Sequence, residues 1–221
     1  MFESVFFYRE RGDDPSFWAE PINAWTNLAF VLAALAAWIL AGRRHARADE
    51  TILLCGLAAV VGIGSFVFHT TARAITMWLD IVPIALYQIA CLWLFGTRLL
   101  KWNRTTTSVM IVAVVGTSFA SLPLRPWLNG SVFYLPALGA LAVVGIQMAR
   151  SDLRERFLIL GGAIVFGVAL FARTWDKSSP WSLGTHFLWH LLNGLLVYLT
   201  LRAWIVNAGN AEPGPASQQS R

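Results

Sequence analysis

The chain has 221 residues, of which 57% are hydrophobic and only 13% are charged. Soluble domains carry about 25% charged residues. This composition therefore excludes an ordinary soluble enzyme, a disordered chain and a disulfide-stapled secreted domain. It indicates a multi-pass membrane protein. Many of the eleven Trp residues lie near the ends of apolar runs, which is typical of the aromatic belts at membrane interfaces.

Seven apolar stretches are candidates to cross a bilayer core, which takes about 20 helical residues. The only acidic residue in them is Asp80. The runs are continuous rather than alternating, so they do not fit a transmembrane barrel. We expect an all-α membrane protein in which residues 1–206 form one seven-helix bundle. The predicted spans are about 21–42, 51–70, 75–97, 106–123, 130–149, 157–172 and 184–205.

The basic residues predict how the bundle is oriented. Eleven of the 17 fall in the loops after spans one, three and five or after span seven, and six fall on the other side. The positive-inside rule then places the N-terminus outside and the C-terminus in the cytoplasm. The net charge of +5 is thus explained by topology, and no nucleic-acid partner is expected. Residues 207–221 are polar and rich in Pro, Gly and Ser, which predicts a disordered tail.

Polar side chains inside a membrane are costly, roughly 2.5–3.5 kcal/mol for a charged residue, so their positions are informative. With the predicted topology, four spans bring polar residues to one depth near the outer face. The two cysteines, Cys55 and Cys91, lie toward the cytoplasmic side, where we expect packing residues rather than a disulfide. The polar residues near the outer face are Glu20, Asn23, Asn27, Ser65, His69, Asp80, His186 and His190.

The histidines have the spacing of a metal site. His186 and His190 are four residues apart and share one helix face, and His69 on another helix is placed to be a third ligand. Three His ligands with an open position are typical of catalytic zinc. Asp80 then lies where a carboxylate could take a proton from metal-bound water, and Ser65 lies one turn before His69.

Other interpretations remain open for the individual residues. A lone His near an interface is usually an amphipathic surface residue, Asp80 alone fits a helix cap, and a Ser in a membrane helix often only eases packing. The set favours metal, because three of the four histidines fall in this layer. A haem protein is a weaker alternative, because a histidine pair on one face cannot clamp one haem from both sides. A non-catalytic, lipid-binding or receptor-like protein with structural zinc also stays possible.

The segment before the first span is acidic. Glu10, Asp13, Asp14 and Glu20 offer hard oxygen ligands of the kind that suit Ca²⁺. The alternative is a solvated leader with Asp and Pro turn chemistry.

Four short motifs carry a resemblance to a known family. They are E-P-I-N-A-W-T-N at 20–27, S-F-V-F-H at 65–69, Asp80, and H-F-L-W-H at 186–190. In this order they resemble the alkaline ceramidase family, seven-helix membrane zinc hydrolases related to the adiponectin receptors, and the compact length suggests a bacterial member.

The resemblance implies a reaction and its residues. Zinc would be held by His69, His186 and His190, Asp80 would activate water and Ser65 would stabilise the oxyanion. The implied enzyme hydrolyses the N-acyl amide bond of ceramide or a related acyl-amide lipid to a fatty acid and an amine, at the non-cytoplasmic face of the membrane. No obligate protein partner is implied. The resemblance also points to calcium, with Glu10, Glu20 and Asn23 as the expected ligands.

Overall fold

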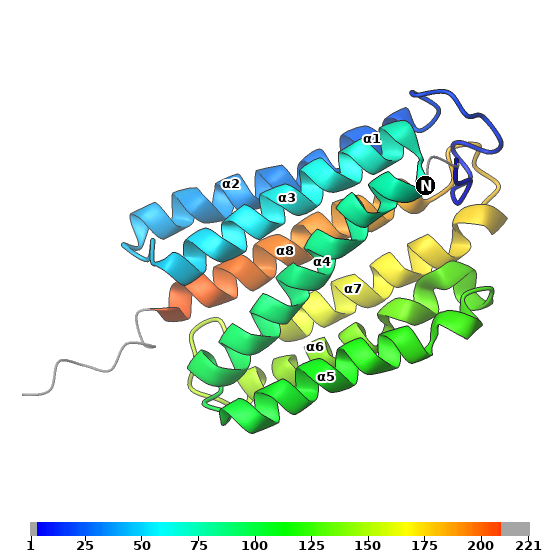
Figure 1. Cartoon of the computed structure of the whole chain (residues 1–221). Helices are drawn as coiled ribbons and strands as arrows, with labels where there is room; N and C mark the ends of the chain where they lie inside the picture. The colour runs from blue at the N-terminus through cyan, green and yellow to red at the C-terminus, as the bar shows by residue number, and fades with distance from the viewer. Residues whose placement is uncertain (1–3, 209–221) are drawn as a thin grey trace, which may run out of the picture.

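The computed structural model describes residues 4–208, which fold as one bundle of helices (Figure 1). Within that range there is no strand, only an isolated bridge between Ser4 and Arg73. The all-α prediction is therefore confirmed for this part of the chain. The elements are α1 (Pro21–Thr26), α2 (Leu28–Arg43), α3 (Asp49–Thr71), α4 (Ala74–Leu94), the π-helix η1 (Phe95–Leu99), α5 (Arg104–Ala120), the 3₁₀ helices η2 (Leu122–Leu124) and η3 (Trp127–Tyr134), α6 (Leu135–Ala149), α7 (Leu158–Trp175), the 3₁₀ helix η4 (Asp176–Ser178) and α8 (His186–Ala208).

Seven long helical segments run between the two ends of the bundle, close to the seven predicted spans. Six of them, in the described part of the chain, are long and apolar enough to cross a membrane. The seventh, α5, has 17 residues and is shorter than the roughly 20 that a bilayer core takes. It lies along α6 at the edge of the bundle (Figure 1). Which end of the bundle faces the cytoplasm stays a prediction.

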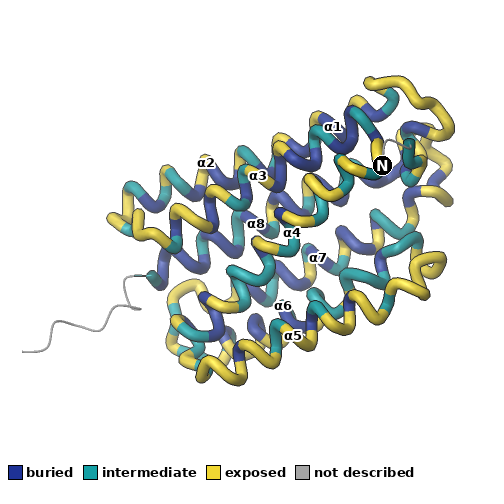
Figure 2. Tube along the Cα trace, viewed as in Figure 1, coloured by how far each residue is buried: buried dark blue, intermediate teal, exposed yellow. Residues whose placement is uncertain are grey.

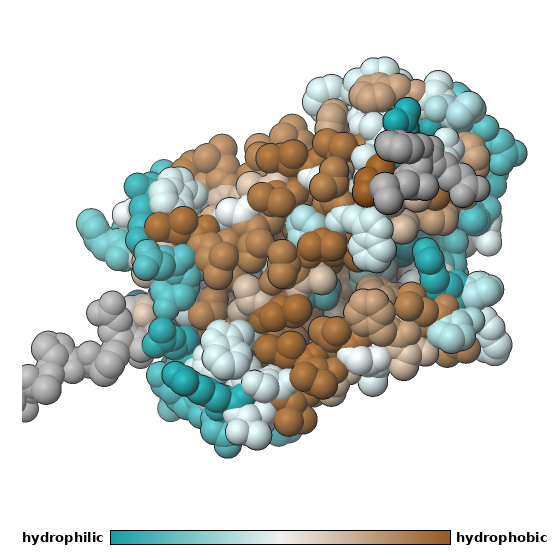
Figure 3. All heavy atoms as spheres, viewed as in Figure 1, coloured by the Kyte–Doolittle hydropathy of each residue, from teal (hydrophilic) through white to brown (hydrophobic). Residues whose placement is uncertain are grey.

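The surface of the bundle is hydrophobic in the way expected of a protein in an apolar environment. On the face drawn in Figure 3, a broad hydrophobic band separates hydrophilic residues at the two ends of the bundle. Many large apolar side chains in that band are exposed, which is unfavourable in water over so large an area. Figure 2 shows the buried stretches along the faces that the helices turn toward one another. Large apolar residues that are exposed elsewhere on the bundle surface as well as on this face include Leu32, Leu35, Val109, Val112, Ile164 and Phe171.

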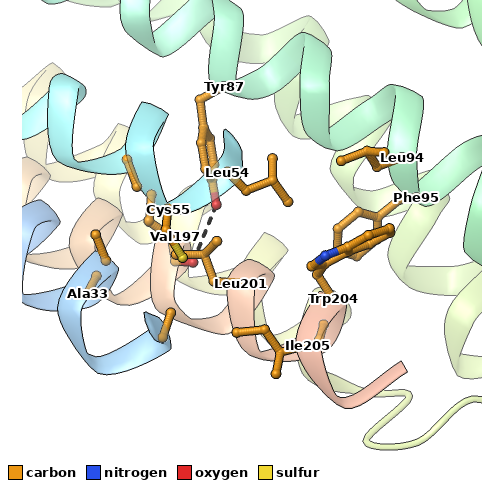
Figure 4. Packing of buried hydrophobic residues seen from close by; sticks show 14 of the residues in the cluster. Ala33, Leu54, Cys55, Tyr87, Leu94, Phe95, Val197, Leu201, Trp204 and Ile205 are labelled. Atoms are coloured by element: carbon orange, nitrogen blue, oxygen red, sulfur yellow. Dashed lines mark hydrogen bonds between the residues drawn. The ribbon is translucent and has the colours of Figure 1, made fainter. Parts of the chain in front are cut away.

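The interior is built from small and aliphatic side chains. Ala37, Ala41, Leu54 and Leu201 are fully buried in the main core cluster. Figure 4 shows Tyr87 of α4 pointing into this cluster, where its hydroxyl donates to the Val197 carbonyl at 3.4 Å. The same hydroxyl lies 2.6 Å from the Thr200 hydroxyl. A polar group in an apolar core is thereby satisfied.

Close helix approaches fix the registers near the end where α3 finishes and α8 begins, which we call the site end. A Cβ added at Gly64 of α3 would fall well inside van der Waals contact with the Leu79 carbonyl of α4, and one at Gly194 of α8 would lie 2.6 Å from Ala29 Cβ. Small residues permit such backbone approach in membrane bundles. Since Gly64 precedes Ser65 and Leu79 precedes Asp80, the α3–α4 approach also sets these two polar residues near each other.

The last helix extends two residues beyond the predicted end of the bundle. Asn207 is fully buried in α8. Its side chain accepts from the Arg154 backbone N–H at 2.9 Å and donates to the Arg154 carbonyl at 3.1 Å. Asn207 and Ala208 therefore belong to the helix rather than to the predicted tail at 207–221. The rest of that tail, 209–221, lies outside the described residues.

Candidate metal centre

Three histidines meet at the site end. His69 comes from the last turn of α3, and His186 and His190 from the first two turns of α8. Each residue is 1% exposed. Their ring centroids lie 5.2 Å (69–186), 4.7 Å (69–190) and 4.6 Å (186–190) apart. One nitrogen from each ring can be chosen so that the three lie within 4.8 Å of one another.

Some ring nitrogens of the triad form hydrogen bonds and others have none, which is the pattern that a metal site requires. His69 Nδ1 lies 2.6 Å from Glu20 Oε2, and His190 Nδ1 lies 2.9 Å from Thr26 Oγ1. His69 Nε2 and His186 Nδ1 are buried, and neither has a hydrogen-bond partner within residues 4–208. Metal-bound imidazoles usually have their second nitrogen fixed by a carboxylate or hydroxyl, which orients the ring. Unpartnered buried nitrogens are otherwise costly, so the residues present fit a metal ion such as zinc.

A buried arginine supports this arrangement from the N-terminal segment. The Arg11 Nε donates to Glu20 Oε1 at 2.6 Å, and another guanidinium nitrogen donates to the His69 carbonyl at 2.9 Å. A third donates to the carbonyls of Asp14 at 3.0 Å and Ser16 at 2.7 Å. Burial alone would raise the pKa of the Glu20 carboxyl, but the hydrogen bonds from His69 and Arg11 hold it below its ordinary value.

The residues predicted to bind calcium lie together beside this network. Their side chains form hydrogen bonds within the protein. The two carboxylate oxygens of Glu10 accept the backbone N–H groups of Ile22 (2.7 Å) and Asn23 (2.8 Å) at the start of α1. Partial burial raises the pKa of Glu10. The Asn23 side chain donates to Glu20 Oε2 at 3.2 Å. All the carboxylate oxygens of Glu10 and Glu20 thus already accept protein hydrogen bonds, and calcium binding stays a prediction.

Ser65 and Asp80 both reach the site end. Ser65 is 2% exposed and lies on α3 one turn before His69. The Asp80 carboxyl, on the second turn of α4, is near enough to interact with Ser65 and His69. The structure therefore brings together the zinc and catalytic residues that the sequence indicated.

Several contacting residues carried no sequence signal. The Tyr8 ring stacks on His186 with centroids 3.6 Å apart and planes at 17°. Arg173 of α7 donates to the Tyr8 hydroxyl at 3.1 Å. Asp176 is fully buried and accepts the backbone N–H groups of Thr185 (2.7 Å) and His186 (2.8 Å), so it fixes the first turn of α8. Tyr8 is remote in sequence from both His186 and Arg173, and Asp176 lies nine and ten residues before the groups that donate to it.

Two cavities lie at or near the site end, and the sequence neighbours of the triad residues, Phe68 and Trp189, are among the residues that line them. The larger, about 860 Å³, is lined by Tyr8, Asp80 and Arg173 among others. The smaller, about 120 Å³, is almost wholly apolar and runs into the bundle between α4, α6, α7 and α8. Tyr134 lines both cavities, so they lie on either side of this residue. A molecule with a polar head and an apolar chain matches this pair of spaces.

Fold and site together define a class: a multi-pass, all-helical protein with a buried three-histidine, metal-competent centre at one end. Comparison with family models gives the particular family. The Ceramidase model matches residues 15–212, and the chain belongs to this family. The family description supports a ceramidase-like hydrolase. No curated protein sequence matches the chain.

Proposed function

We propose that the chain is a zinc-dependent membrane amidase that hydrolyses the N-acyl amide bond of ceramide or a related acyl-amide lipid. The observation that carries the proposal is the pair of buried, unpartnered nitrogens on His69 and His186, within a triad whose other contacts already fix the rings. Family membership supports the amide substrate. The reaction consumes one water and gives a fatty acid and an amine.

Zinc bound by His69, His186 and His190 would polarise the amide carbonyl and acidify a water. The chain's own residues do the rest. Asp80 takes the proton of the attacking water and can deliver it to the leaving amine. The Ser65 hydroxyl donates to the carbonyl oxygen as negative charge develops there.

Other residues hold this centre and admit the lipid. Glu20 and Thr26 fix the rings of His69 and His190. The apolar cavity receives the acyl chain and excludes water from it. In the proposed orientation the N-terminus is outside, the C-terminus is cytoplasmic, and the site faces the non-cytoplasmic side.

The first test removes one ligand. His186→Gln should abolish stoichiometric zinc and lower fatty-acid release below detection, because a two-histidine site binds the metal far more weakly and leaves its coordination incomplete. Metal analysis of the purified protein and mass spectrometry of the released acid measure both. The matched control is His45→Gln, since His45 is exposed in the α2–α3 loop at the opposite end.

Each outcome of this test has a distinct meaning. If His186→Gln keeps stoichiometric zinc, the ligand assignment is wrong. If the wild-type protein holds zinc but releases no acid from any N-acyl lipid, the amidase proposal fails and the centre is structural.

A further inference from the structure

Arg173 is a guanidinium in the wall of the larger cavity without a carboxylate partner. The ion pairs of the described residues are Arg11–Glu20, His69–Glu20, Arg98–Glu50 and Arg202–Glu155, so Arg173 belongs to none. Its Nε is buried and has no hydrogen-bond partner in the part of the chain that the structure describes. Its one side-chain hydrogen bond goes to a neutral group, the Tyr8 hydroxyl at 3.1 Å. An unpaired charge at membrane depth is expensive and points to function.

Aromatic faces hold this guanidinium in place. Its central carbon lies 5.7 Å from the Tyr8 ring centroid, 5.4 Å from that of Tyr134 and 5.5 Å from that of Trp189. Cation–π contacts of this kind orient a guanidinium while leaving N–H donors free for an anion. The three aromatic rings therefore orient the Arg173 guanidinium toward the cavity without neutralising its charge.

The cavity around Arg173 has an excess of positive charge. Arg125 and Lys177 line it as well, and both are exposed. Its one carboxylate is Asp80, which belongs to the proposed chemistry. Three cationic groups and one such carboxylate favour an anionic occupant. With a neutral head group, the three cationic groups would face only the single negative charge of Asp80.

Tyr8 connects this charge to the histidines. One face of its ring stacks on His186 with centroids 3.6 Å apart, and its hydroxyl accepts from Arg173. Trp189, which Arg173 also contacts, lies between His186 and His190 in sequence on α8. An anion bound at Arg173 is thus one aromatic ring away from the triad. This separation fits a substrate whose anionic group lies close to its amide bond.

We propose that the larger cavity binds the anionic head of an N-acyl amino acid or its sulfonate analogue, with the carboxylate or sulfonate on Arg173 and the acyl chain in the apolar cavity. The inference rests on the proposed amidase function and narrows its substrate class. In the reaction water adds to the carbonyl carbon and the C–N bond breaks. The products are a fatty-acid carboxylate and an amino acid whose nitrogen has taken both hydrogens of the water and leaves as an ammonium group, so charge and atoms balance.

A matched pair of substrates tests the proposal. N-oleoylglycine and N-oleoylethanolamine share the acyl chain and differ in whether the head is anionic. The purified, zinc-loaded full chain should prefer N-oleoylglycine in kcat/KM by about 10- to 100-fold, the value of one charge-assisted contact, mainly through KM. Arg173→Gln should bring this ratio near one, and Arg173→Lys should restore part of it. The control is Arg104→Gln, which removes an exposed charge at the opposite end.

Two results would overturn the proposal. One is a wild-type preference for N-oleoylethanolamine. The other is an equal loss on both substrates in Arg173→Gln, which would make Arg173 a general support for Tyr8. Zinc content and melting temperature of each variant show whether the fold is kept.

Equilibrium binding separates this proposal from the amidase function. If neither amide is hydrolysed, the function fails. The anion site then still predicts saturable binding of N-oleoylglycine that is tighter than that of N-oleoylethanolamine and depends on Arg173. A final measurement is the competition of oleate with N-oleoylglycine for binding. Should oleate bind as tightly as N-oleoylglycine through Arg173, the cavity holds the product acid and the head-group assignment is wrong.

Discussion

The two ends of the bundle use the same charged residue types in opposite ways. At the site end, Arg11 and Glu20 are 3% and 2% exposed, and their ion pair at 2.6 Å continues into His69. At the opposite end the Arg202–Glu155 pair is equally short, at 2.6 Å, but about a third of each side chain is exposed. Distance alone therefore says little about the energetic weight of an ion pair. Burial decides it, because a buried charge that loses its partner cannot be solvated.

Breaking the buried pair should have the largest effect. Arg11→Met leaves the Glu20 carboxylate buried without its arginine and frees the carbonyls of Asp14, Ser16 and His69. We expect a loss of about 3–5 kcal/mol in unfolding free energy. Zinc affinity should also fall about 10- to 100-fold, since Glu20 orients His69. Denaturant titration in detergent and competition with a zinc chelator measure the two losses.

A matched arginine at the opposite end provides the control for this change. Arg98→Met removes an exposed partner of Glu50, whose ion pair is 3.1 Å long, and should leave zinc affinity as it is. Equal destabilisation by Arg11→Met and Arg98→Met would contradict the contrast between the two ends. Loss of stability without any loss of zinc affinity would separate Arg11 from the metal centre.

The second prediction compares two glycines of one helix. Gly64→Ala places a methyl group against the Leu79 carbonyl, so α3 and α4 must separate where they set Ser65 beside Asp80. We expect about 1–3 kcal/mol of destabilisation from overpacking and lower turnover. Gly56→Ala, on the same helix but nearer the opposite end, meets no atom within 4 Å. It should be neutral or stabilising by up to about 1 kcal/mol.

Melting temperatures of the two glycine variants give the comparison directly. If Gly64→Ala melts no lower than Gly56→Ala, the close approach of α3 and α4 is not a structural constraint. A variant that stays folded but loses turnover would show that the approach matters for placing Ser65 and Asp80.

The sequence could predict the bundle and the triad because both depend on local patterns. Hydrophobic length locates the spans, and the spacing of His186 and His190 puts both on one helix face. His69 and Asp80 were found because ionisable residues in apolar runs are rare. The sequence pattern did not reveal the tertiary contacts around the site. The Arg11 contact with His69 joins residues 58 apart, and no local signal marks a basic residue in an acidic leader as buried.

Contacts between distant segments also explain why α8 begins and ends at other residues than the sequence predicted. α8 begins at His186 because the Asp176 carboxylate, ten residues earlier, accepts the first backbone N–H groups. It continues through Ala208 because Asn207 pairs with the Arg154 backbone across the bundle. Both are contacts between chain segments, and composition alone made residue 207 look like the start of the tail.

The smallest expected effect comes from the exposed pair at the opposite end. Hydrogen bonding by Arg202 lowers the pKa of the Glu155 carboxyl. A carboxyl with a lowered folded-state pKa stabilises the fold above its unfolded pKa of about 4.3, and the contribution is lost as pH falls through the folded value. Because the pair is partly exposed, Glu155→Gln should cost only about 0.2–1 kcal/mol at pH 7 and less in high salt. Wild type and variant should converge in melting temperature below pH 4. A gap that persists at low pH would mean that Glu155 acts through the α6–α7 backbone, where its φ is +50°, rather than through its charge.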